Sequence, residues 1–136
     1  MARIFPSHGG LLEARREGQV VFVHGSGSTN VEATQAFFQA LMPLVAELEG
    51  SRWGVLGSTE GEAVLTPDAE AQMTAAAPIL SAKGRVAVAI VVPQTPLGSI
   101  VQSQWTRVYR DAGCALSFFP DQMQALVWLQ SVIADD

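Results

Sequence analysis

The sequence predicts a single α/β domain over residues 1–136, with a mixed, mostly parallel sheet of about five strands and four helices. In the predicted strand 85–92 (RVAVAIVV), every residue after Arg85 is apolar, without polar alternation, which is typical of a strand covered on both faces. Short apolar runs alternate with longer stretches of helical periodicity in the order β-β-α-β-α-β-α-β-α. This alternation favours parallel strands joined by right-handed crossovers.

The chain opens with a predicted hairpin. Residues 11–16 and 20–24 are short strand-like runs on either side of Glu17-Gly18-Gln19. The first helix follows over residues 31–48, where apolar side chains recur at helical spacing and Thr29 stands three residues before Glu32, as in a capping box. Pro43 removes one backbone hydrogen bond, so we expect a kink or a break there.

The later elements carry clearer start signals. Residues 53–58 form the next predicted strand, and Thr66-Pro67 then supplies a cap followed by proline at the first helical position. Thr95-Pro96 repeats this signal after the strand at 85–92. Residues 115–119 form the last predicted strand, and Asp121 is expected to cap the final helix.

Composition excludes several classes of function. Eight Lys and Arg against thirteen Asp and Glu give a formal charge of −5, which disfavours nucleic acid as a partner. A single cysteine, Cys114, and two histidines leave no basis for a structural zinc site, so we expect no metal and no cofactor. No stretch resembles a signal peptide or a membrane span, so we expect a cytoplasmic protein.

The loop VFVHGSGSTN, residues 21–30, could be catalytic or purely structural. An esterase would need a Gly-x-Ser-x-Gly nucleophile and a late histidine, and the sequence has neither. The phosphate-binding patterns fail at Asn30 and Val31. Glu60, Glu62 and Asp68 are expected to be solvated loop charges rather than an acid–base pair. We therefore predict a structural loop, no catalytic residue and no enzyme, with hydrolase activity the least favoured function.

Several stretches together resemble the STAS domain, and in particular the SpoIIAA-like branch of small bacterial proteins. They are VHGSGSTNVEATQAFF, WGVLGS, RVAVAIVVPQTPLGSI and YRDAGCALSFFPDQMQALVWL. The resemblance implies a role in switching partners rather than in turning over a substrate. Related antagonists of anti-sigma factors use a serine or threonine after an Asp as a phosphorylation switch. Here Gly57-Ser58-Thr59-Glu60-Gly61 has no Asp-Ser pair, and nearby carboxylates would repel a phosphate. We expect the switch to be missing.

Ligands of open α/β sheets gather beyond the carboxyl ends of parallel strands. In this sequence those ends predict a rim for a ligand or a partner, made of His24, Ser26, Ser58, Thr59, Glu60, Gln94 and Thr95. Ordinary caps and turns would explain the same residues. Trp128 falls just off the apolar face of its helix, so we predict that it contacts a second chain.

Two functions from different classes remain open. The first is a non-catalytic interaction or regulatory domain that binds a protein partner or a second copy of itself as a homodimer. The alternative is a binding protein for a small apolar or lipid-like molecule. The alanine-rich stretch 74–78 could leave room for such a ligand between a helix and the sheet, although close packing explains it equally well.

Overall fold

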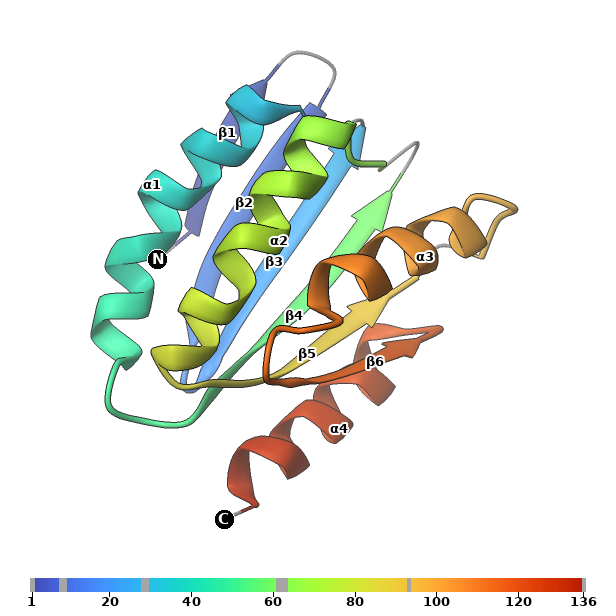
Figure 1. Cartoon of the computed structure of the whole chain (residues 1–136). Coiled ribbons are helices and arrows are strands. Elements are labelled where there is room, and N and C mark those ends of the chain that lie inside the picture. The colour runs from blue at the N-terminus through green and yellow to red at the C-terminus, as the bar shows by residue number, and fades with distance from the viewer. Residues whose placement is uncertain (1, 8–9, 28–29, 61–63, 93, 136) are drawn as a thin grey trace.

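The computed structural model of the chain describes residues 2–7, 10–27, 30–60, 64–92 and 94–135 (Figure 1). Its sheet has six strands, whose order in the sheet follows the chain: β1 (Ala2–Ser7), β2 (Gly10–Glu17), β3 (Val20–Gly27), β4 (Trp53–Glu60), β5 (Arg85–Val91) and β6 (Ala115–Phe119). The first three strands pair antiparallel, and β3 to β6 pair parallel. The predicted mixed α/β fold is confirmed, with β1 as an added edge strand.

Three helices lie on one face of the sheet and the fourth lies on the other (Figure 1). The first face carries α1 (Val31–Leu48), α2 (Pro67–Ala82) and α3 (Gly98–Tyr109), whereas α4 (Gln122–Ala134) covers the opposite face. Right-handed crossovers between neighbouring parallel strands leave their helices on the same face, which accounts for this layering. The described residues form an apolar core on each side of the sheet, together with a small third cluster of Leu65, Ala69 and Val108.

The helix starts follow the local chemistry with two corrections. Thr66 accepts a hydrogen bond from the Ala69 amide at 3.3 Å, so the cap predicted for α2 is confirmed. The Asp121 carboxylate likewise accepts one from the Gln124 amide at 2.8 Å at the start of α4. The cap of α1, however, is not the predicted Thr29, which lies outside the described residues.

Asn30 is the N-cap of α1, and its side chain accepts a hydrogen bond from the Ala33 amide at 2.9 Å. The second correction concerns α3, which begins at Gly98 rather than directly after Thr95. Thr95 instead accepts a hydrogen bond from the Leu97 amide at 3.3 Å, so it stabilises the turn that precedes the helix.

Pro43 lies inside α1, which continues from Val31 to Leu48, so of the kink or break expected there the break does not occur. Both Pro43 and Gln39, whose carbonyl loses its helical partner, are on the solvent-exposed side. Water can satisfy that carbonyl, while Leu41 and Leu44 on either side of the turn remain buried against the sheet. Packing therefore outweighs the missing backbone bond.

The core opposite α1–α3 depends on a close approach of α4 to the sheet. A Cβ atom added at Gly54 of β4 would lie 2.6 Å from Cδ1 of Leu129 and 3.0 Å from the carbonyl oxygen of Ala87. Leu129 itself is fully buried. The absence of a side chain at Gly54 is therefore what allows α4 to sit directly on the strand.

Candidate functional site

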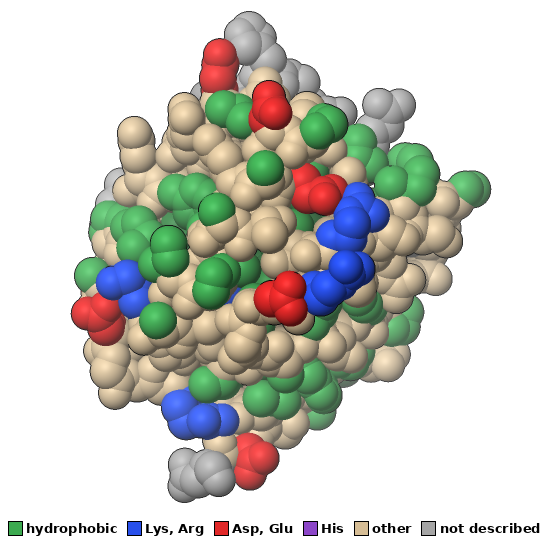
Figure 2. Space-filling model, in the orientation of Figure 1, with side chains coloured by type: hydrophobic (Ala, Val, Ile, Leu, Met, Phe, Trp, Pro, Cys, Tyr) green, Lys and Arg blue, Asp and Glu red, His purple; other side chains and the backbone are tan. Residues whose placement is uncertain are grey.

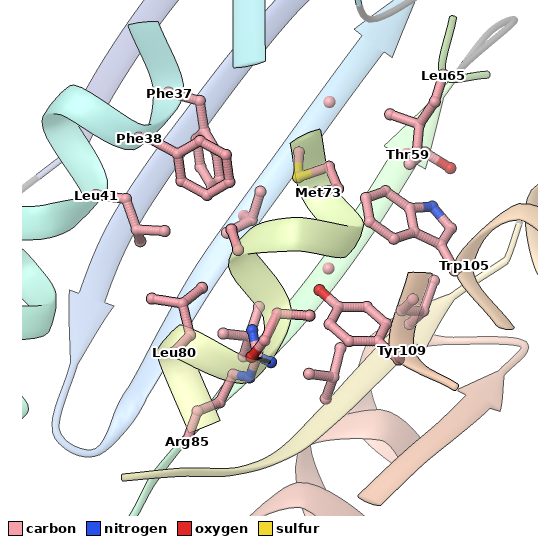
Figure 3. A pocket seen from close by; sticks show the side chains of 18 of the residues that line it. Phe37, Phe38, Leu41, Thr59, Leu65, Met73, Leu80, Arg85, Trp105 and Tyr109 are labelled. Carbon is pink, nitrogen blue, oxygen red and sulfur yellow. Dashed lines mark hydrogen bonds between the residues drawn. The ribbon is translucent and has the colours of Figure 1, made fainter. Parts of the chain in front are cut away.

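An apolar cavity of about 90 Å³ lies between the sheet and helices α1–α3 (Figure 3). Strands β3, β4 and β5 form its floor. Its walls come from all three helices and include Phe37, Phe38 and Leu41 of α1, Met73 and Leu80 of α2, and Trp105 of α3. On this face of the molecule, acidic and basic side chains lie next to one another rather than in a patch of one sign (Figure 2).

The cavity exists because small residues line it on both sides, on the sheet and on α2. Gly57 of β4 lines it, and the nearest atom to a Cβ added there is Cγ1 of Ile90, at 3.9 Å, an ordinary contact distance. Ala76 and Ala77 of α2 line it from above the sheet. Of the two interpretations left open for the alanine-rich stretch 74–78, close packing or room between helix and sheet, this lining favours the second.

Arg85, the first residue of β5, brings a charge to one end of the cavity. Its exposed fraction is 2%. Nη2 donates hydrogen bonds to the Ala77 carbonyl at 2.7 Å and to Oγ of Ser81 at 3.3 Å, but buried Nε has no partner among the described residues. Within the same described part of the chain, no Asp or Glu forms an ion pair with Arg85. A buried cation normally needs such compensation.

Tyr109 of α3 lies beside Arg85 at the same end of the cavity (Figure 3). The Cζ atom of Arg85 is 5.1 Å from the centroid of the tyrosine ring, which in turn stacks on Trp105 with centroids 5.8 Å apart. Burial raises the pKa of the Tyr109 phenol, and the positive charge of Arg85 opposes the rise only in part. The hydroxyl therefore keeps its proton at neutral pH and can donate a hydrogen bond.

Thr59 lines the cavity near Leu65, at the end opposite Arg85 (Figure 3). Its Oγ1 atom is buried, with no hydrogen-bond partner in the part of the chain that the structure describes. The cavity therefore has apolar walls with polar groups at both ends. Ligand sites are commonly built in this way, because apolar walls supply affinity and a few polar groups fix orientation.

The predicted rim is divided between different places. Ser58 and Thr59 line the cavity. His24 lines a different hollow, beside Arg15 and Phe22, which Ser58 borders too. His24 and Ser58 are partners in the β3–β4 register, and their Nδ1 and Oγ atoms are 2.7 Å apart. Such a pair resembles a catalytic base beside a nucleophile. However, two residues that are partners in the register of neighbouring strands lie close together in any sheet, so their proximity alone does not indicate catalysis.

Ser26, Gln94 and Thr95 do not line the cavity. Ser26 pairs with Glu60 in the register of β3 and β4. Gln94 and Thr95 are exposed in the turn before α3, where Nε2 of Gln94 donates to the Val92 carbonyl at 3.3 Å. Of the carboxylates expected to be solvated loop charges, Asp68 is exposed and Glu62 lies outside the described residues. The caps-and-turns interpretation thus fits Gln94 and Thr95.

Trp128 is half-buried and packs on Phe119, with ring centroids 5.5 Å apart. It forms part of the core beneath α4, and its contact with a second chain stays a prediction. Cys114 is half-buried. None of the described His, Cys, Asp and Glu residues gather in groups that could hold a metal ion. Across the described residues, no helix combines the length and apolar character needed to cross a membrane.

Sequence reasoning missed the two polar residues that distinguish the cavity. In the sequence, Arg85 stands out only as the first residue of a predicted buried strand, and no motif sets Tyr109 apart. One signal was available. Arg85 is the first residue of a strand that is covered on both faces, so its side chain starts next to a buried layer. The approach of Tyr109 to that arginine had no local signal, because it depends on how α3 crosses the sheet.

Comparison with known proteins supports the fold. No family model matches the sequence, and no curated protein matches it. The structure is similar to that of an uncharacterised protein of the DUF3478 family with a SpoIIAA-like fold, from Shewanella loihica PV-4. The TM-score is 0.59 and the identity 18%, over 89% of this chain and 94% of the other. The chain therefore has a SpoIIAA-like α/β fold, as the resemblance in its sequence implied.

Proposed function

We propose that this protein is a non-catalytic binding protein that holds a small, mainly apolar molecule between its sheet and helices α1–α3. The observation that supports this proposal is the cavity of about 90 Å³ with apolar walls. Each CH₂ group moved from water into such a space contributes roughly 0.8 kcal/mol. Of the two functions left open by the sequence, the cavity favours the ligand-binding one.

The size of the cavity limits the ligand. An engineered cavity of about 150 Å³ holds benzene, so each of the six carbon atoms takes up about 25 Å³ of cavity volume. On that scale, the 90 Å³ enclosed here suits about four carbon atoms. The ligand is therefore a short chain, or a longer one of which only the end is enclosed.

The proposed function does not use a phosphorylated serine. The Ser58 side chain is half-buried, and its Oγ atom lies 2.7 Å from Nδ1 of His24 in a hydrogen bond. Both features would hinder a kinase from reaching this hydroxyl. The sequence around it also lacks the Asp-Ser pair of the switch. Both observations support a role that depends on occupancy of the cavity rather than on phosphorylation.

A series of 1-alkanols from butanol to octanol tests the proposal, with binding followed by NMR of the labelled protein. Affinity is expected to rise with chain length while carbons enter the cavity and then to level off. Ala76→Leu places a larger side chain in the cavity and should abolish binding. Ala75→Leu is the matched control, since Ala75 is the exposed neighbour on the same helix. The proposal fails if no alcohol binds or if Ala76→Leu binds as well as the parent protein.

A further inference from the structure

The charge on Arg85 is unusual for a cavity of this kind. Its side chain is almost completely buried, and its two recorded hydrogen bonds both come from Nη2 and go to neutral acceptors. Nε, buried as well, has no acceptor in the described structure. Leaving one donor of a buried cation unsatisfied is costly. Among the described residues, Arg85 therefore lacks both an acceptor for Nε and a counter-ion for its charge.

A purely structural role explains only part of this arrangement. Nη2 links β5 to the Ala77 carbonyl near the end of α2, so Arg85 holds that helix against the sheet. This link requires one neutral donor. It accounts neither for a full positive charge in an apolar layer nor for the unpaired Nε.

The surroundings of Arg85 suit an anion that enters through the cavity rather than from solvent. Arg85 lines the cavity, and so does Tyr109, whose ring lies against the guanidinium. The tyrosine contributes a hydroxyl donor at the same end (Figure 3). Apart from Ser58 and Thr59, the other side chains that line the cavity are apolar. A guanidinium with a neighbouring hydroxyl matches a carboxylate, which accepts hydrogen bonds at two oxygens.

We propose that the ligand of this cavity is a monocarboxylate with a short apolar chain, whose carboxylate pairs with Arg85 and whose chain lies among the side chains of α1–α3. This inference rests on the proposed function, because it assigns the chemical class of the molecule that the same cavity binds. The carboxylate supplies the acceptor that Nε lacks and neutralises the buried charge.

Pentanoate and pentanamide provide the test, since the two molecules have nearly the same shape and differ in charge. We expect the parent protein to bind pentanoate about ten- to a hundredfold more tightly than pentanamide, as a charge-assisted hydrogen bond implies. Arg85→Met should remove this preference but keep the binding of pentanamide. Arg110→Met is the control: Arg110 is exposed and follows α3, so this variant should keep the preference.

A readout in the parent protein covers the case in which Arg85→Met does not fold. The Nε–H resonance of Arg85, assigned through Arg85→Lys, should shift on addition of pentanoate and stay in place with pentanamide. Equal affinities for the two molecules in the parent protein, or a preference that survives in folded Arg85→Met, would overturn this inference and leave the proposed function standing. Failure of pentanoate, pentanamide and 1-pentanol alike to bind would overturn both.

Discussion

The guanidinium of Arg85 packs on the ring of Tyr109, with Cζ 5.1 Å from the ring centroid. This contact joins the start of β5 to the end of α3 across the apolar layer of the protein. A cation over an aromatic face is attracted more strongly where water is excluded. The pair therefore stabilises the position of α3 and gives one end of the cavity its polarity.

Tyr109 is the only tyrosine of the chain, so the absorbance of tyrosinate reports on this residue alone. Because burial raises its pKa, the native protein should ionise at a higher pH than the chain unfolded in urea, where the pKa is about 10. Stability from this effect is complete below the unfolded pKa and is lost as the pH rises through the folded one.

Removing the charge of Arg85 should raise the pKa of Tyr109 further, because that charge now lowers it. An absorbance titration of Arg85→Met checks this directly. Coincident titration midpoints for the native and unfolded parent protein would contradict the burial of the phenol.

Two glycines of β4 should respond in opposite ways to the same substitution. Gly54→Ala forces a methyl group against Cδ1 of Leu129 and the Ala87 carbonyl, so it should lower the free energy of unfolding by about 1–3 kcal/mol. Gly57→Ala meets Ile90 at an ordinary distance and should be neutral or slightly stabilising. Urea denaturation of both variants measures the difference. Equal losses of unfolding free energy in the two variants would contradict the close contact between Gly54 and α4.

The bidentate ion pair between Glu70 of α2 and Arg107 of α3 should make stability depend on pH. The hydrogen bond from Arg107 holds the pKa of the Glu70 carboxyl below its usual value. The stability that this pair contributes is therefore present above the usual pKa of glutamate and is lost as the pH falls through the lowered one.

Glu70→Gln should accordingly cause a small loss of stability at pH 7, small because solvent screens so exposed a pair, and almost none at pH 2. Denaturation curves of the parent and the variant at the two pH values provide the comparison. A loss of the same size at both would show that the charge of Glu70 is not its cause.

The cap of α1 can be assigned by two substitutions. Asn30→Ala removes the acceptor of the Ala33 amide and should cost about 1 kcal/mol of stability. Thr29→Ala should cost less, because the structure places the cap at Asn30. Thermal denaturation of the two variants ranks them, and a larger loss for Thr29→Ala would restore the cap predicted from the sequence.

Local chemistry accounts for the parts of the fold that could be predicted. Thr66 and Asp121 start their helices as expected, because cap signals act within a few residues. The edge strand β1 had no comparable signal, since Pro6 within it argues against a strand except at the edge of a sheet. At α1 two cap-forming residues, Thr29 and Asn30, stand side by side, and spacing to Glu32 favoured the wrong one.

The cavity could not be predicted in the same way. Its volume depends on how far α1, α2 and α3 stand from the sheet, which no local pattern specifies. Of the rim expected at the strand ends, Ser58 and Thr59 line this cavity, and a binding role for them stays a prediction. The predicted rim missed Arg85, because Arg85 lies at the opposite end of the strands.

The strand order of the sheet also bears on how the protein folds. Among the residues that the structure describes, each of β1 to β6 is hydrogen-bonded only to strands that precede or follow it directly in the chain. The sheet can therefore grow outward from the β2–β3 hairpin by adding one strand and its helix at a time. No segment has to be threaded between two strands already in place, so loop closures stay short and rapid assembly is favoured.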